Sequence, residues 1–170
     1  VPFLRPENIS GHEVPMIDVV QHACKLLMEQ DVPIDVLVLL QPTSPLREVD
    51  DIDNAIEMFL TQEVDSVVSV VRPSHIFHPR KLFREENHLL VPYQESGGEF
   101  SDDNGSTIFA RNGPAVLVLN PGVLSANSLY GERSAPYEMY QQRSVDIDTP
   151  FDFLFAEFLL HQRVDGSQRG

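Results

Sequence analysis

The sequence is poor in cysteine and in positive charge, and it has no long apolar run. Cys24 is the only cysteine, which excludes an internal disulfide and a cysteine-based zinc site and fits a reducing compartment. Only 12 lysines and arginines stand against 26 acidic residues, and the net charge of −14 excludes nucleic acid and anionic membranes as general partners. No apolar run approaches the roughly 20 residues that cross a bilayer, and none has the pattern of a signal peptide. We therefore expect a cytoplasmic protein with no membrane partner.

The length of 170 residues predicts a single domain over residues 1–170 with a sizeable core. An apolar fraction of 42% is typical of soluble globular proteins. The first residues, VPFLRPENIS, read as if the chain starts in the middle of a fold, so we expect the domain to be N-terminally incomplete.

Helical and extended patterns alternate in the first part of the chain. Apolar residues recur at helical spacing over 15–30 and over 48–62, where Asp50 is the expected N-cap. Two short apolar runs, 34–41 and 65–71, are typical of strands buried on both faces. This alternation predicts an α/β domain with a mostly parallel sheet.

The second half predicts a further buried strand over 114–120, short strands over 135–140 and 143–148, and a final helix over 149–162. Thr149 is the expected cap of this helix and Pro150 its first residue. Its predicted buried stripe comprises Phe151, Leu154, Phe155, Phe158 and Leu159. Between the two halves, some 40 residues from about Arg72 to Asn112 lack a clear helix, which favours an insertion with a role of its own.

The segment QPTSPLR, residues 41–47, leaves a predicted buried strand at the edge where α/β proteins bind ligands. Gln41 carries an amide suited to a base edge, Ser44 offers a hydroxyl, and Arg47 offers a guanidinium for a phosphate or carboxylate. The alternative is a proline-rich turn whose hydroxyls bond the local backbone.

Two carboxylates, Asp146 and Asp148, precede the final helix at positions that lie on the same side of an extended chain. Mg²⁺ takes one or two carboxylates together with substrate phosphates and water, so the pair is a candidate metal site. The alternative is that Asp148 helps to cap the helix while Asp146 faces solvent or Arg143.

Asn112 and Gly113 form a turn signal before the strand over 114–120. Asn112 either belongs to a plain turn or is aimed at a ligand hydroxyl. His75 and His78 lie near prolines, a setting more typical of loop residues than of zinc ligands.

Several motifs occur in the order seen in acylneuraminate cytidylyltransferases, the CMP-sialic acid synthetases, which the sequence resembles over nearly its whole length. These motifs are FLRPENIS, LLQPTSPLR, DSVVSV, RNGPAVLVL, LYGERSAPYEM and RSVDIDTPFDFLFAE. The resemblance implies a Rossmann-like, three-layer nucleotidyltransferase fold of the nucleotide-diphospho-sugar transferase type. It also implies a homodimer formed through an inserted segment, here about residues 76–109.

The resemblance implies that CMP is transferred from CTP to an acidic nine-carbon sugar with Mg²⁺, and that pyrophosphate is released. Asp146 and Asp148 would hold the metal and act as the catalytic residues. The substrate-binding residues implied in the same way are Arg5, Gln41, Ser44, Arg47, Arg111 and Asn112.

Three departures from the family keep other functions open. The opening strand and its phosphate-cradling loop have no counterpart here, His12 stands where an aspartate is usual, and Asp102 and Asp103 occupy a segment that is usually rich in arginine. One alternative is a non-catalytic, truncated nucleotide-binding or interaction module. Another is a cytidylyltransferase for an octulosonate, legionaminate or pseudaminate sugar, and a glycosyltransferase with an Asp-x-Asp metal site is a third.

Overall fold

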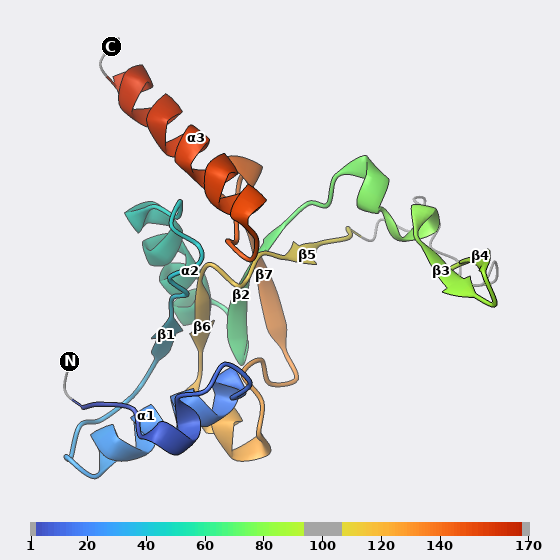
Figure 1. The fold of residues 1–170 in the computed structure, drawn as a ribbon. Coiled ribbons are helices and arrows are strands. Elements are labelled where there is room, and N and C mark those ends of the chain that lie inside the picture. Colours follow the sequence, from blue (N-terminus) through green and yellow to red (C-terminus); the bar gives the residue numbers. More distant parts are fainter. Residues whose placement is uncertain (1–2, 94–106, 168–170) are drawn as a thin grey trace.

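Strand β2 (Ser66–Val71) is the centre of a five-stranded sheet in the computed structural model, which describes residues 3–93 and 107–167. On one edge, β2 pairs with β6 (Leu117–Leu119) and then with β5 (Ala110–Arg111); on the other it pairs with β7 (Ser134–Glu138). Strand β1 (Leu37–Leu39) pairs with the far side of β6 (Figure 1). The predicted strands over 34–41, 65–71, 114–120 and 135–140 are thus confirmed.

The prediction of a mostly parallel sheet is wrong, because the sheet is mixed. Only β2 and β7 pair in parallel, whereas β1–β6, β2–β6 and β2–β5 are antiparallel. Strands β1 and β2 still run in the same direction, since both are antiparallel to β6, which lies between them. An apolar run indicates burial on both faces but not strand direction, and this is why the sequence did not reveal that β6 runs antiparallel to its neighbours.

Alternate residues of β6 serve two core clusters on opposite faces of the sheet. Leu117 and Leu119 pack with Val20 and Cys24 of helix α1 (Met16–Met28). Val116, just before the strand, and Val118 pack with helix α2 (Val49–Thr61) through Ala55. The result is an α/β domain in which helices cover both faces of the sheet.

Helix α3 (Pro150–Ser167) begins as predicted, with Thr149 before it and Pro150 as its first residue. Four of the five residues of its predicted buried stripe are exposed: Phe151 (74%), Leu154, Phe155 and Phe158. Only the fifth, Leu159, is partly buried as predicted. The helix packs through Ala156 and Leu159 onto Leu46 and Val145. The prediction failed because α3 packs on the loop residues Leu46 and Val145 rather than on a sheet. Its remaining large apolar side chains therefore face outward.

Two further local predictions were wrong. Helix α2 is capped by Glu48 rather than Asp50: the Asp51 carboxylate accepts a hydrogen bond from the Glu48 backbone N–H at 2.8 Å in a capping box. Residues 143–148 form no strand: Arg143 ends a 3-10 turn over Gln141–Arg143, and residues 144–148 are irregular. Both segments are held by long-range ion pairs that local propensity does not encode.

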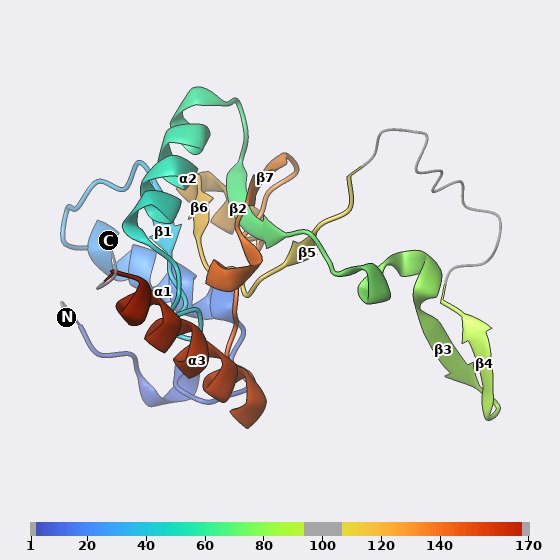
Figure 2. The ribbon, with the colours of Figure 1, turned by 90° about the horizontal axis from the view of Figure 1, so that it is seen from above.

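The predicted insertion includes an antiparallel hairpin of β3 (Phe83–Glu86) and β4 (Leu89–Pro92). Figures 1 and 2 show this hairpin at the end of an arm that projects away from the sheet. Residues 94–106, which include Asp102 and Asp103, lie outside the described residues. None of the helices in the described part of the chain has the length and apolar character needed to span a membrane.

Candidate functional site

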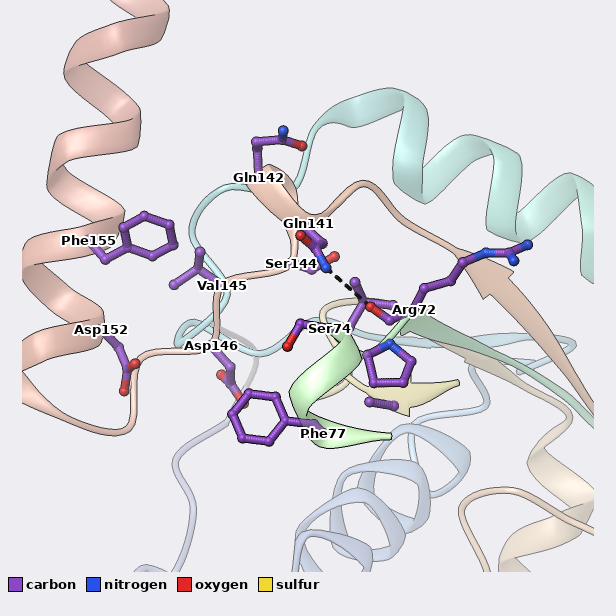
Figure 3. A pocket seen from close by; sticks show the side chains of 13 residues that line it. Arg72, Ser74, Phe77, Gln141, Gln142, Ser144, Val145, Asp146, Asp152 and Phe155 are labelled. Carbon is purple, nitrogen blue, oxygen red and sulfur yellow. Dashed lines mark hydrogen bonds between the residues drawn. The ribbon is translucent and has the colours of Figure 1, made fainter. Parts of the chain in front are cut away.

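Two cavities adjoin at the end of the sheet near the predicted site residues. The first, here called the acidic cavity, has a volume of about 560 Å³ and carries the Asp146 and Asp152 carboxylates. The second, here called the Gln41 cavity, has a volume of about 420 Å³ and is lined by Gln41, Arg111 and Gly113 among others. Figure 3 shows the side chains around the acidic cavity, which come from the segment after β2, from residues 141–146 and from α3.

The Gln41 loop, residues 41–47 between β1 and α2, is held in shape by one of its own side chains. The Arg47 guanidinium donates hydrogen bonds to the carbonyl oxygens of Gln41 at 2.6 Å and Ser44 at 2.8 Å. Leu46 is fully buried against α3. These contacts hold Ser44 in a buried position, whereas the use of Arg47 for a phosphate stays a prediction, because its Nη1 already serves the loop.

Asp146 lines the acidic cavity and lies beside Gly113, which lines the Gln41 cavity. Val145 and Ile147 pack into the cluster below α3, and Asp146 lies between them with its side chain toward the acidic cavity (Figure 3). The Ser44 hydroxyl donates to Asp146 Oδ1 at 3.5 Å. A Cβ on Gly113, which lines the Gln41 cavity, would lie only 3.1 Å from both Asp146 Oδ2 and Ser44 Oγ. The absence of a side chain at Gly113 therefore permits this close approach.

Asp148 is exposed, and its backbone N–H rather than its carboxylate contacts Asp152. Asp152 Oδ2 accepts hydrogen bonds from the Thr149 hydroxyl at 2.7 Å, from the Thr149 N–H at 2.8 Å and from the Asp148 N–H at 3.3 Å. The Thr149 hydroxyl and N–H, followed by the Asp148 N–H, hold the pKa of Asp152 below its usual value. Asp152 is thus an ionised cap that fixes the backbone on which Asp148 sits.

The other predicted substrate-binding residues are separated by the fold. Asn112 is 5% exposed, and its Oδ1 accepts a hydrogen bond from the Ser69 hydroxyl at 2.7 Å, so its side chain ties β2 to the turn before β6. The Arg111 guanidinium lies over the Tyr130 ring in the Gln41 cavity. Arg5 is exposed in the N-terminal segment and lines neither cavity. Asn112 as a sugar ligand and Arg5 as a nucleotide ligand stay predictions.

The donor set fits a divalent cation that is completed by a substrate. Within the described ranges, no three histidine, cysteine or acidic side chains come together as a closed metal site. Mg²⁺ does not require one, because it commonly takes one or two carboxylates plus phosphate oxygens and water. Asp146 supplies such a carboxylate beside the acidic cavity, and the Ser44 hydroxyl adds an oxygen donor next to it. Asp148 lines neither cavity, so its part in holding a cation stays a prediction.

The sequence did not identify several residues of the acidic cavity. Arg72, Ser74 and Phe77 line it from the segment after β2, and Gln141 joins them through a hydrogen bond from its amide to the Arg72 carbonyl at 3.2 Å. No motif marks these residues. Asp152 could have been found, because Thr149 and Asp152 have the spacing of a capping box.

Comparisons with known proteins agree with these features. No protein-family model matches the sequence. The chain is 29% identical over 165 residues to the CMP-N,N'-diacetyllegionaminic acid synthase of Legionella pneumophila, which covers 94% of this chain and 68% of that protein. It is 27% identical over 158 residues to the N-acylneuraminate cytidylyltransferase of Escherichia coli, covering 91% of this chain and 36% of that protein.

A third relative, the pseudaminic acid cytidylyltransferase of Campylobacter jejuni, is 22% identical over 158 residues and covers 93% of this chain and 68% of its own length. The names of these three relatives give different sugars but share cytidylyl transfer or CMP-sugar synthesis. The motif resemblance described above is confirmed, because relatives named as sugar cytidylyltransferases or CMP-sugar synthases match most of the chain.

Proposed function

We propose that this chain carries the catalytic centre of a cytidylyltransferase, which transfers CMP from CTP to an acidic nine-carbon sugar and releases pyrophosphate. The observation that carries the proposal is the approach of Ser44 to Asp146, which lines one cavity and lies next to Gly113 of the other. Two adjoining cavities offer room for two substrates, and the carboxylate lies where their reacting groups would meet. The relatives named above support this class of reaction. The sheet covered by helices on both faces agrees with a nucleotidyltransferase-type fold.

In the proposed reaction, an anomeric hydroxyl oxygen of the sugar forms a bond to the α-phosphorus of CTP, and the bond from that phosphorus to the bridging oxygen breaks. The hydroxyl proton passes to solvent water, and the bridging oxygen leaves with pyrophosphate. Asp146 and Asp148 would hold Mg²⁺, which when bound offsets the negative charge of the phosphates. The chain contributes position: Ser44 and Gly113 fix Asp146, and the Asp152 cap fixes the backbone at Asp148.

Pyrophosphate release tests the proposal directly. We expect release when the protein is incubated with CTP, Mg²⁺ and one of a panel of acylneuraminic, legionaminic, pseudaminic and octulosonic acids. Product formation with one sugar identifies the substrate, since the names of the relatives leave this choice open. No release with any sugar, together with no CTP binding by calorimetry, would instead favour the non-catalytic module.

We also propose that two copies associate through the projecting arm. Its hairpin exposes Phe83, Leu89, Leu90 and Tyr93, a density of apolar side chains that is unusual on a solvated surface. We expect a dimer in sedimentation equilibrium at micromolar concentration. Leu90→Glu should shift the protein toward the monomer, whereas Glu85→Gln, a change at an already polar position of the same hairpin, should not. A monomer in the unsubstituted protein would contradict this assignment.

A further inference from the structure

Arg143 lies three residues before Asp146 and reaches across to the first turn of α2. Its Nη1 donates to Glu48 Oε2 at 2.7 Å, and its Nη2 lies 2.9 Å from Asp51 Oδ1. Glu48 and Asp51 lie 95 and 92 positions before Arg143 in the sequence. The two terminal nitrogens of the guanidinium therefore bridge the capping residues of α2. This contact fixes the start of residues 143–148, which we call the carboxylate segment.

The contact lies in a largely dry setting. Asp51 is 0% exposed, and the Arg143 side chain is only 20% exposed. The guanidinium also lies over the ring of Tyr140 at 5.1 Å, which covers it from another side. The Tyr137 hydroxyl donates to the same Asp51 oxygen, Oδ1, at 3.3 Å. An ion pair with this burial and several partners has one well-defined geometry, unlike an exposed pair.

The same region is fastened at two further points. The Ile147 N–H donates to the Thr43 carbonyl at 2.8 Å, so the carboxylate segment runs along the Gln41 loop. Arg163 of α3 donates to the Leu46 carbonyl at 3.0 Å and lies 3.4 Å from Glu48 Oε1. Glu48 thus joins α2, α3 and the carboxylate segment. Asp146 lies between the Arg143 and Ile147 fastenings, so its position depends on both.

We propose that Arg143 is a positioning residue that sets the carboxylate segment for cation binding while touching neither substrate nor metal. The proposal rests on the proposed function, because the cation is the one that Asp146 and Asp148 would hold. Its physical basis is geometry: a lysine at this position keeps the charge but cannot bridge Glu48 and Asp51 with two parallel donors. Supporting residues of this kind typically change metal affinity 10- to 100-fold when they are replaced.

Mn²⁺ binding in the presence of CTP tests the proposal, because Mn²⁺ stands in for Mg²⁺ and its binding is followed by electron paramagnetic resonance. We expect Arg143→Lys to weaken Mn²⁺ binding by roughly tenfold or more. Arg84→Gln, which removes an arginine from an exposed pair in the hairpin, should leave it unchanged. Val67→Ala removes part of the core below α2, in a cluster that shares no residue with either cavity, and so controls for loss of stability alone. All proteins are measured well below their unfolding temperatures.

The outcomes separate the two proposals. If Arg143→Lys does not fold, the double variant Asp51→Asn with Arg143→Gln removes both buried charges and is expected to show the same weakened binding. Unchanged Mn²⁺ affinity in a folded Arg143 variant, with binding intact in the unsubstituted protein, would overturn the role of Arg143 alone. No Mn²⁺ binding to the unsubstituted protein with CTP would overturn the proposed function and the role of Arg143 with it.

Discussion

Replacing Asp146 with asparagine is expected to lower the rate of CTP-dependent pyrophosphate release by roughly 10³-fold, the scale seen when one group that stabilises transition-state charge is lost. The amide keeps the shape of the carboxylate and can still accept from Ser44, so the local fold should persist. What is lost is the negative charge that would hold a cation against the phosphates. The initial rate at saturating CTP, sugar and Mg²⁺ measures the effect, and the thermal unfolding midpoint verifies the fold.

Asp148→Asn is expected to have an effect of the same order, because a cation completed by phosphate oxygens has few protein ligands to spare. The matched control is Asp50→Asn, which removes an exposed carboxylate of α2 that lines neither cavity. We expect this control to lose much less activity than either metal-site variant. Near-normal turnover in Asp146→Asn or Asp148→Asn would show that the substituted carboxylate is not a ligand.

The sequence was informative where burial alone determines structure. The apolar runs over 34–41, 65–71 and 114–120 became strands β1, β2 and β6. Strands β2 and β6 lie between two covered faces, whereas β1, at the edge of the sheet, leaves Val38 exposed. Thr149 and Pro150 marked the start of α3 because capping is a local interaction. The Ser44 and Asp146 motifs were both identified, and the structure brings them together although they are 102 positions apart.

The sequence was uninformative where a contact between distant segments decides the structure. The two carboxylates were expected on one side of a strand, but residues 143–148 are irregular because Arg143 and the Ile147 N–H fasten them to other segments. Arg143 was weighed only as a neighbour of Asp146, and its actual partners on α2 have no motif in common with it. Asn112 carried a turn signal, which could not reveal that its amide is used inside the core.

Asp51→Ala is expected to destabilise the fold by about 3–5 kcal/mol, the usual cost of removing one partner of a buried ion pair. Three interactions are lost together: the ion pair to Arg143, the hydrogen bond to the Glu48 N–H and the one from the Tyr137 hydroxyl. The Arg143 guanidinium would keep Glu48 but lose its fully buried partner, and burial disfavours a charge left without one. Urea denaturation followed by circular dichroism measures the free energy of unfolding.

Asp50→Ala is the matched control, since Asp50 is an acidic residue of the same first turn but is exposed. We expect its cost to stay within about 0.5 kcal/mol, as for most surface substitutions. Asp51→Asn separates charge from hydrogen bonding, because the amide oxygen can still accept from the Glu48 N–H while the ion pair is lost. If Asp51→Ala and Asp50→Ala cost the same, the buried pair contributes no net stability. The cap of α2 would then be set by Glu48 and by packing, and the carboxylate segment would have to be held by Ile147 and its neighbours instead.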